Sequence, residues 1–443
     1  MAAAGPMCTI ISSGMTTGFS AVLLPQLELA SSHIRITKEE ASWIASMAAL
    51  PMALGCVLGG ILMERFGRKT SHQIIAVPYV LGWVCISLSR AVWMLYVGRF
   101  LTGLCLGLMG PLTPVYIAET AGPNFRGILL AGVSLAVSSG ILISHLLGTF
   151  LHWQLAAALS ALFPFACYIG ISFVPESPPW LAARGRFTEA VKAFRWFRGY
   201  SPESTRELRE LLEKYQVNGH DASAQSTITM KEAFLHVTFV KPFLVMNLFF
   251  LVMQFSGVNA VAFYTVHILR DMGQGMNEYL ATNIIGVVRL IMSVVACVLT
   301  RRFGRRPLTM LSCIGTGVSL VLLGLTIRSK IDACLPLLLL VTYICFISIG
   351  LVPLPWVMVG EVFPVRMRGI GSGVSSAFCF LVFFAVVKTS PATMEAIGAD
   401  GTFFFYGAVA LVGAGLLFLC LPETRNRTLQ EIENSYQRKP APV

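Results

Sequence analysis

Polar residues inside long apolar segments carry the chemistry that this sequence suggests. Gln254 and Asn259 share one such segment, and His145, Arg289 and Trp356 lie in three others. An unpaired polar side chain in apolar surroundings costs free energy unless it faces an interior. Amides both donate and accept hydrogen bonds, and an indole offers a flat apolar face with one N–H donor. These groups therefore suit contact with a neutral polyhydroxylated solute.

A second set of charged residues lies at the ends of the apolar segments and occurs twice. Glu119 precedes Arg126 by seven residues, and Glu361 precedes Arg368 by the same interval. Three motifs repeat in the same order in the two parts of the chain. The first is Glu64-Arg65-Phe66-Gly67-Arg68-Lys69, which matches Arg301-Arg302-Phe303-Gly304-Arg305-Arg306. The second is the Glu-to-Arg interval, and the third is Pro175-Glu176-Ser177, which matches Pro422-Glu423-Thr424. An internal duplication explains this order, and two related halves around a central site are typical of transporters.

The composition excludes an ordinary soluble enzyme. Of the 443 residues, 55% are hydrophobic and 12% are charged, whereas soluble domains carry about 25% charged residues. The net charge of +11 does not indicate nucleic-acid binding, because the basic residues lie in the short segments between apolar stretches. In that position they indicate membrane orientation. The first apolar stretch lacks the features of a signal peptide and is predicted to be a membrane helix.

Twelve apolar segments are each long enough to cross a bilayer. The predicted spans are 6–28, 41–63, 71–89, 93–117, 126–151, 154–174, 238–268, 277–300, 307–327, 334–358, 369–388 and 402–421. The sequence therefore predicts an all-α integral membrane protein with the major facilitator fold, in which twelve transmembrane helices form two six-helix halves.

The segments between the spans complete the predicted organisation. The halves are 1–174 and 238–421, joined by a helical linker over 175–237, and residues 422–443 form a tail. Within the linker we expect an amphipathic helix near Phe187, a second helix capped by Ser201, and a flexible stretch over 217–229. Most Lys and Arg lie on the side of the linker, which places the linker, the tail and both termini in the cytoplasm.

The ordered motifs resemble those of the sugar porter, or glucose transporter, family of the major facilitator superfamily. The resemblance rests on the two G-R-[RK] loops, Pro114-Val115-Tyr116-Ile117-Ala118-Glu119, Pro175-Glu176-Ser177-Pro178, Gln254-Phe255-Ser256-Gly257-Val258-Asn259 and Pro422-Glu423-Thr424-Arg425. Within that family, the stretch from Gly14 to Ser20 is similar to the insect facilitated trehalose transporters. The resemblance implies alternating access of two halves to a central sugar site.

Residues and resemblance together define two candidate sites. The predicted substrate site contains Gln254, Asn259, Trp356, His145, Arg289 and Tyr264. The predicted cytoplasmic gate contains Arg68, Arg99, Glu119, Arg126, Arg305, Glu361 and Arg368, with the charges of one half facing those of the other. Gly257 permits a helix break that would turn both amides toward one cavity. Helix–helix hydrogen bonds, an interfacial tryptophan, packing and charges that only set topology are the alternative explanations.

Arg289 departs from the family pattern. It lies near the centre of a span, where a guanidinium costs about 2.5–3.5 kcal/mol, and we find no carboxylate in mid-span to pair with it. It either binds backbone carbonyls and water, or binds substrate oxygens and favours an acidic or strongly polar solute. Met253 and Phe383 also depart from the family pattern, so several of the family's usual contacts with a polyol are missing.

The function expected from the sequence is facilitative uniport of a sugar such as a hexose or trehalose at the cell membrane. Proton-linked relatives carry an Asp in the first span, and Thr16 occupies that position here. We expect no enzyme activity and no cofactor, metal or nucleotide, since the chain contains no phosphate-binding loop. The expected partners are a small sugar and the bilayer, without nucleic acid, and we expect a monomer to suffice. A nutrient sensor that transports nothing, and a transporter of another polar or acidic solute, remain as alternatives.

Overall fold

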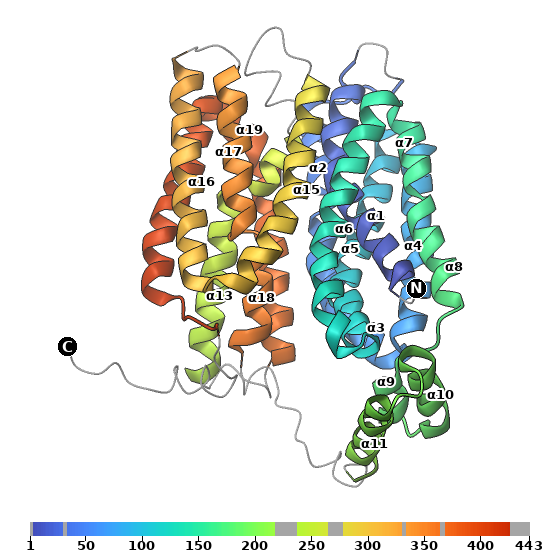
Figure 1. Ribbon diagram of the computed structural model, residues 1–443. Helices are drawn as coiled ribbons and strands as arrows, with labels where there is room; N and C mark the ends of the chain where they lie inside the picture. Colours follow the sequence, from blue (N-terminus) through green and yellow to red (C-terminus); the bar gives the residue numbers. More distant parts are fainter. Residues whose placement is uncertain are drawn as a thin grey trace, which may run out of the picture.

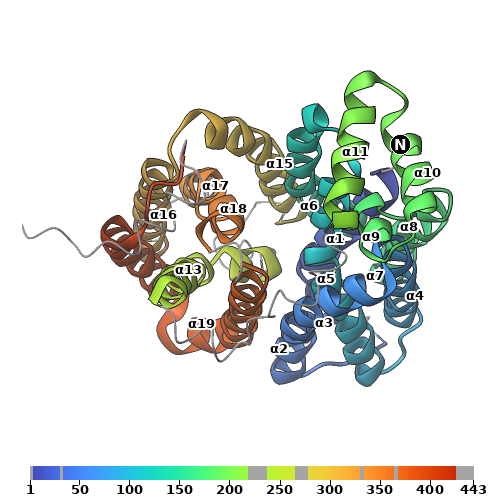
Figure 2. The same ribbon diagram turned by 90° about the horizontal axis from the view of Figure 1, so that it is seen from below.

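The computed structural model describes residues 3–29, 33–217, 237–264, 278–329, 334–363 and 368–425. The secondary structure in these ranges is helical, and the helices form two bundles that lie side by side (Figure 1; Figure 2). One bundle is built from the first part of the chain and the other from the last part. The predicted all-α membrane architecture in two halves is confirmed.

The N-terminal half contains eight helical elements. They are α1 (Ala4–Leu27), α2 (Lys38–Ser46), α3 (Leu50–Phe66), α4 (Arg68–Ser87), α5 (Val92–Thr120), α6 (Pro123–Phe150), α7 (Trp153–Ser160) and α8 (Leu162–Ser172). The second predicted span is divided between α2 and α3, and the sixth between α7 and α8. A capping box starts α2, because Thr37 Oγ1 accepts the backbone N–H of Glu40 and Glu40 in turn accepts that of Thr37.

Three helices follow outside the bundle, and they mark one end of the molecule (Figure 1). They are α9 (Pro178–Ala183), α10 (Phe187–Arg198) and α11 (Pro202–Val217). The predicted cap of α11 is confirmed, because Ser201 Oγ accepts the backbone N–H of Ser204 at 3.1 Å. The stretch predicted to be flexible lies, apart from residue 217, outside the described residues. We call the end that carries these helices the linker end, and the opposite end the far end.

The C-terminal half contains α13 (Val237–Phe255), α15 (Glu278–Arg302), α16 (Arg305–Arg328), α17 (Cys334–Ile349), α18 (Pro353–Val362) and α19 (Arg368–Cys420). The last two predicted spans are joined in α19, where Gly398 at φ +78° interrupts the helical backbone between them. The tenth predicted span is divided, because α18 starts afresh at Pro353 after α17 has ended. Proline fits the first turn of a helix, where its missing N–H is not needed.

The helices are long and apolar enough to account for the predicted number of crossings. Ten helices in the described part of the chain meet the length and hydropathy needed to cross a membrane, and one of them covers the 50 residues Gly371–Cys420. That length suffices for two crossings. The 20-residue helix α4, which is less apolar, supplies a further one.

Close contact between α1 and α6 depends on glycine. A Cβ atom added at Gly140 would lie 2.0 Å from the carbonyl oxygen of Ile11, and one added at Gly14 would lie 2.1 Å from that of Val137. Both neighbours are backbone atoms, which have little freedom to move away. Small residues of this kind let membrane helices approach each other.

We predict that Gly140→Ala lowers the thermal unfolding midpoint of the protein in detergent. The extra methyl group overpacks the contact between α1 and α6, which costs about 1–3 kcal/mol. Gly60→Ala in α3 is the matched control, because a Cβ at Gly60 meets nothing within 4 Å. An equal midpoint for the two variants would contradict the packing argument.

Candidate functional site

The break predicted in the seventh span is present. The helix α13 ends at Phe255, Gly257 adopts φ +82°, and helical backbone resumes at residue 258. On a straight helix, side chains five residues apart point about 140° away from each other. Here the break lets Asn259 Nδ2 donate to Gln254 Oε1 at 2.5 Å. The two amides therefore form one polar group at the break.

The two amides differ in how much of their surface remains accessible. Gln254 is 1% exposed, and its Nε2 donates to Cys379 Sγ of α19 at 3.2 Å. Asn259 is only half-buried. Gln254 is therefore held within the C-terminal half, whereas Asn259 keeps a surface that a bound molecule can reach.

Trp356 lies in the first turn of α18, in the C-terminal half. Its ring packs at centroid distances of 5.1 Å from Phe250 and 5.7 Å from Phe380. The side chain is nevertheless 41% exposed. Two aromatic neighbours fix the orientation of the indole and leave part of its surface open.

The predicted outer aromatic residues make packing contacts. Tyr264 is buried, and its hydroxyl donates to the carbonyl of Val387 at 3.3 Å. Phe263 meets Phe383 edge-on at 5.5 Å, and the guanidinium of Arg99 lies 5.9 Å from the Phe263 ring. Neither aromatic side chain is exposed in this structure.

His145 and Arg289 come from opposite halves and lie close to each other. A Cβ at Gly286 of α15 would lie 3.5 Å from His145 Nδ1, so the buried imidazole of α6 faces α15. Arg289, one helical turn further along, interacts electrostatically with His145 and with Tyr343 of α17. The Tyr343 hydroxyl donates to the carbonyl of Ser256 at 3.0 Å, beside the break in α13. The structure thus brings the amides, Arg289 and His145 into one region.

The Tyr343 side chain was not predicted from the sequence. It is a single tyrosine within an apolar stretch, and only the need of a buried hydroxyl for a partner hints at its role. The sequence does not reveal that its partner is the carbonyl next to Gly257.

Arg99 lies elsewhere than the other predicted gate residues. It is fully buried, and it donates to the carbonyl of Thr16 at 2.9 Å and to Ser20 Oγ at 2.5 Å. It also donates to the carbonyl of Ile44 in α2. Placing Arg99 at the linker end was therefore wrong. The physical reason is that α5 begins at the far end and Arg99 lies only two turns into it.

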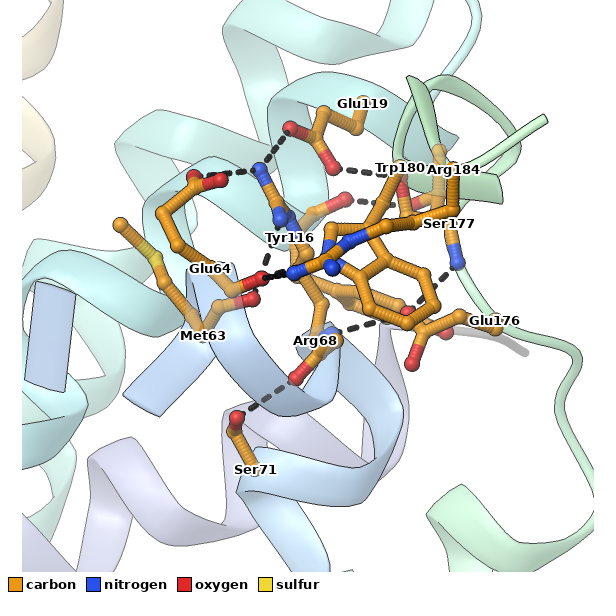
Figure 3. A network of polar contacts seen from close by, with 12 residues as sticks. Met63, Glu64, Arg68, Ser71, Tyr116, Glu119, Glu176, Ser177, Trp180 and Arg184 are labelled. Carbon is orange, nitrogen blue, oxygen red and sulfur yellow. Dashed lines mark hydrogen bonds and ion pairs between the residues drawn. The ribbon is translucent and has the colours of Figure 1, made fainter. Parts of the chain in front are cut away.

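At the linker end of the N-terminal half, Arg68 joins two carboxylates (Figure 3). Its Nη2 lies 3.0 Å from both Glu64 Oε1 and Glu119 Oε1. The other oxygen of Glu119 accepts the hydroxyl of Ser177, which follows α8. Glu176 accepts the backbone N–H groups at the start of α4, including that of Arg68 at 2.9 Å. The start of α4, the end of α5 and the residues that follow α8 are thus held together.

The C-terminal half repeats this arrangement. Arg305 Nη2 lies 3.0 Å from Glu361 Oε1, and Thr424 Oγ1 donates to Glu361 Oε2 at 2.6 Å. Glu423 accepts the backbone N–H groups of Arg305 at 2.9 Å and Arg306 at 3.1 Å. The motifs that repeat in the sequence therefore form the same cluster twice.

The ion pairs of each cluster lie entirely within its own half. The expectation that Glu119 and Glu361 face charges of the opposite half is not met between the residues whose side chains are described. Each of these carboxylates is already bound by an arginine and a hydroxyl of its own half. The side chains of Arg126 and Arg368 lie outside the described part of the structure.

Comparison with known proteins agrees with this duplicated architecture. The model of the sugar (and other) transporter family matches residues 5–436. The chain belongs to the sugar transporter family. It is 33% identical over 434 residues to the facilitated trehalose transporter Tret1-2 homolog of Drosophila simulans, covering 96% of this chain and 88% of the relative. It is also 33% identical to the facilitated trehalose transporter Tret1 of Apis mellifera ligustica, covering 94% and 84%. Members of this family are multi-pass membrane transporters and not enzymes.

Solved structures show the same fold. The xylose transporter XylE from E. coli in an inward-open conformation superposes with a TM-score of 0.82, at 22% identity and with 98% of each chain covered. The proton:xylose symporter XylE bound to 6-bromo-6-deoxy-D-glucose gives a TM-score of 0.77 at 23% identity, covering 98% of this chain and 99% of that chain. The major facilitator fold predicted from the sequence is confirmed.

The two halves of this sugar transporter family member are joined toward the far end. Lys38 Nζ lies 2.8 Å from Glu395 Oε1, and Ser42 Oγ donates to the carbonyl of Lys388 at 3.0 Å. The Lys388 ammonium lies 4.1 Å from the centroid of the Trp43 ring. Between described residues, the hydrogen bonds and ion pairs that cross from one half to the other lie toward this end, including that from Asn283 to Thr149.

Electrostatics at the linker end favours ionised Glu423. Burial opposes its ionisation, but backbone N–H donors from Arg425, Arg305 and Arg306 and the charge of Arg305 hold the pKa of Glu423 below its ordinary value. A carboxylate that accepts several backbone N–H groups is stabilised in its charged form. Glu423 therefore fastens the end of α19 to the start of α16 as an anion.

We predict that Glu423→Gln destabilises the protein at pH 7 and that this difference shrinks as the pH falls below about 4. Because the pKa is lowered in the folded state, the stabilisation is present above the unfolded-state pKa and is lost as the pH falls through the folded-state value. Thermal midpoints of both proteins in detergent between pH 7 and pH 3 measure it. The control is Glu213→Gln at an exposed position of α11. A difference that does not change with pH would refute the role of the charge.

Proposed function

We propose that this protein carries a sugar, such as a hexose or trehalose, across the cell membrane by facilitative uniport with alternating access. The observation that carries the proposal is the break at Gly257, which joins Gln254 and Asn259 into one polar group between apolar helices. Trp356, in the same half of the molecule, keeps part of its indole surface open. Amides and an indole face provide the hydrogen bonds and the apolar surface that a sugar ring requires.

The individual residues have different roles in this proposal. Asn259 and Trp356, which keep accessible surface, contact the sugar directly. Gln254 and Tyr264 are buried and hold the binding groups in place through Cys379 and Val387. His145 and Arg289 bring the N-terminal half and α15 to the same site. The relatives named as facilitated trehalose transporters support a disaccharide or hexose as the solute.

The surroundings of Arg99 support transport without proton coupling. A proton-coupled carrier needs a group that gains and loses a proton during the cycle. The hydrogen bonds of Arg99 go to two backbone carbonyls and one hydroxyl, all of them neutral. Thr16, at the position where proton-linked relatives carry an Asp, bonds to Tyr79 with its hydroxyl at 3.0 Å. Nothing in this set titrates near neutral pH.

Alternating access follows from the distribution of the contacts between the halves. We place the linker end and both termini in the cytoplasm, because basic residues concentrate there. The far end, joined by the contacts of α2 with α19, is then extracellular, and in our proposal the site opens to the cytoplasm while these contacts hold. The gate at the linker end comprises Arg68, Glu119, Arg126, Arg305, Glu361 and Arg368, and it closes when the halves approach each other. Each bound carboxylate keeps lone pairs for a further partner.

The proposal also covers how the chain is divided, where the protein works and what it needs to work. The halves span residues 1–174 and 238–421, with the linker over 175–237 and the tail over 422–443. The protein works as a monomer in the cell membrane, without a cofactor and without nucleic acid. Between described residues no group of three His, Cys, Asp or Glu side chains is arranged to hold a metal ion.

Uptake of labelled glucose and trehalose into proteoliposomes tests the proposal. We expect entry that saturates and stops when inside and outside concentrations are equal, unchanged by a protonophore. Trp356→Ala should raise the half-saturating concentration, with Trp196→Ala on the exposed face of α10 as the control. Accumulation above the external concentration that a protonophore abolishes would contradict uniport. Sugar binding without counterflow would instead indicate a sensor.

A further inference from the structure

The guanidinium of Arg289 projects from the inner face of α15. The exposed apolar residues of this helix recur every three or four positions and form one stripe, which includes Leu280, Ile284, Val287 and Ile291. Arg289 follows Val287 by two residues, which is about 200° around the helix. Arg289 therefore lies on the face of α15 opposite the apolar stripe.

Arg289 has no anionic partner among the residues that the structure describes. Arg289 takes part in none of the ion pairs or hydrogen bonds that form between the described residues. A fully buried guanidinium nitrogen without a hydrogen bond would be an orphaned polar atom, and none of the Arg289 nitrogens is of this kind. The side chain is half-buried and keeps contact with solvent. Arg99, by contrast, is fully buried and has neutral partners for its guanidinium.

The position of Arg289 is central along the helix. It is the twelfth of the 25 residues of α15, so about 16 Å of helix lies between it and the first residue. A guanidinium at such a depth is unfavourable unless something compensates its charge. Among the described residues, those that interact electrostatically with it are neutral or cationic, namely His145 of α6 and Tyr343 of α17. The described residues of the site therefore offer a positive charge without supplying a negative one.

Arg289 and the proposed sugar contacts belong to the same region. Tyr343, which interacts electrostatically with Arg289, donates its hydroxyl to the carbonyl of Ser256 at 3.0 Å. Ser256 precedes the break at Gly257, which positions Asn259. A solute that reaches the amide of Asn259 therefore comes near the unpaired cation.

We propose that the sugars carried by this transporter include sugar acids, polyhydroxylated monocarboxylates whose carboxylate binds Arg289. A guanidinium binds a carboxylate through two parallel N–H donors, which is stronger than a bond between neutral groups. This inference rests on the proposed transport function and names its substrate class. It accounts for Arg289, which a neutral sugar leaves without a counter-charge.

A monoanion fits this site better than a dianion. Arg289 supplies one uncompensated positive charge, and the neighbouring described groups that we identify add amides, a phenol and an imidazole. A carboxylate neutralises that charge. A phosphate ester with close to two negative charges would leave one of them uncompensated in a medium of low dielectric constant, which is unfavourable.

Competition for uptake into proteoliposomes separates the substrate classes. Labelled glucuronate, glucose and trehalose are offered to the native protein, to Arg289→Gln and to Arg289→Lys. Gluconate, glucose 6-phosphate and lactate serve as unlabelled competitors. Binding of glucuronate, glucose and trehalose to the purified protein is also measured by calorimetry, because binding does not depend on completed transport. Thermal midpoints show whether each variant is folded.

The expected result is that glucuronate binds and enters, that gluconate competes and that lactate, which lacks most hydroxyl groups, competes poorly. Glucose 6-phosphate should compete less well than gluconate. Arg289→Gln should weaken glucuronate binding by about tenfold or more while Arg289→Lys retains part of it. Binding of neutral sugars should fall much less in Arg289→Gln.

Two results would overturn the inference in distinguishable ways. Uptake of glucose or trehalose that gluconate and glucuronate leave unaffected would preserve sugar transport and refute the sugar-acid class. Arg289 would then be compensated by water and backbone carbonyls. If calorimetry detects no binding of any of these solutes to folded protein, both the substrate class and the proposed function fail.

Discussion

The need to satisfy every polar group without help from lipid governs this structure. In hydrocarbon an uninterrupted helix satisfies its own backbone, so each interruption requires partners from neighbouring helices. The break at Gly257 meets this requirement. The hydroxyl of Tyr343 donates a hydrogen bond to the carbonyl of Ser256. The side chain of Tyr406 fills the space that a Cβ at Gly257 would occupy. The irregular backbone that forms the polar centre is therefore held by α17 and α19.

The charged clusters at the linker end solve a related problem for the helix ends. Glu176 and Glu423 accept the backbone N–H groups at the starts of α4 and α16, which would otherwise lack partners. Arg68 and Arg305 connect these starts to the ends of α5 and α18 through Glu119 and Glu361. Since both clusters are closed within their own half, each half is braced independently. Two braced bodies that touch toward the far end can rock against each other without losing these bonds.

Much of the architecture was predictable because it depends on local properties of the chain. The length of the apolar stretches predicted the crossings, and the duplicated motifs predicted two similar halves. The break at Gly257 was predictable because glycine lies between two amides in a span that offers them no water. Similar reasoning identified Ser201 as the cap of α11.

The partners of the charges were not predictable, because they depend on tertiary geometry. Equal spacing of Glu119 to Arg126 and of Glu361 to Arg368 suggested pairing across the halves. The spacing contains no information on Arg68 and Arg305, which approach from other helices and bind the carboxylates first. Arg99 was misplaced for a similar reason. Its neighbours on α1 and α2 are distant in sequence, and no pattern links them to it.

In the proposed mechanism, transport requires the far end to open while each half stays intact. The most direct test replaces Lys38 and Glu395, which pair across the halves at 2.8 Å, with cysteines and joins them by a cleavable bifunctional thiol reagent. We expect the joined protein to stop taking up solute and to recover when the reagent is cleaved. The same reagent between cysteines at positions 186 and 189, which pair within the linker, should leave uptake unchanged, as should treatment of the native protein. Full uptake with the far end covalently closed would contradict alternating access.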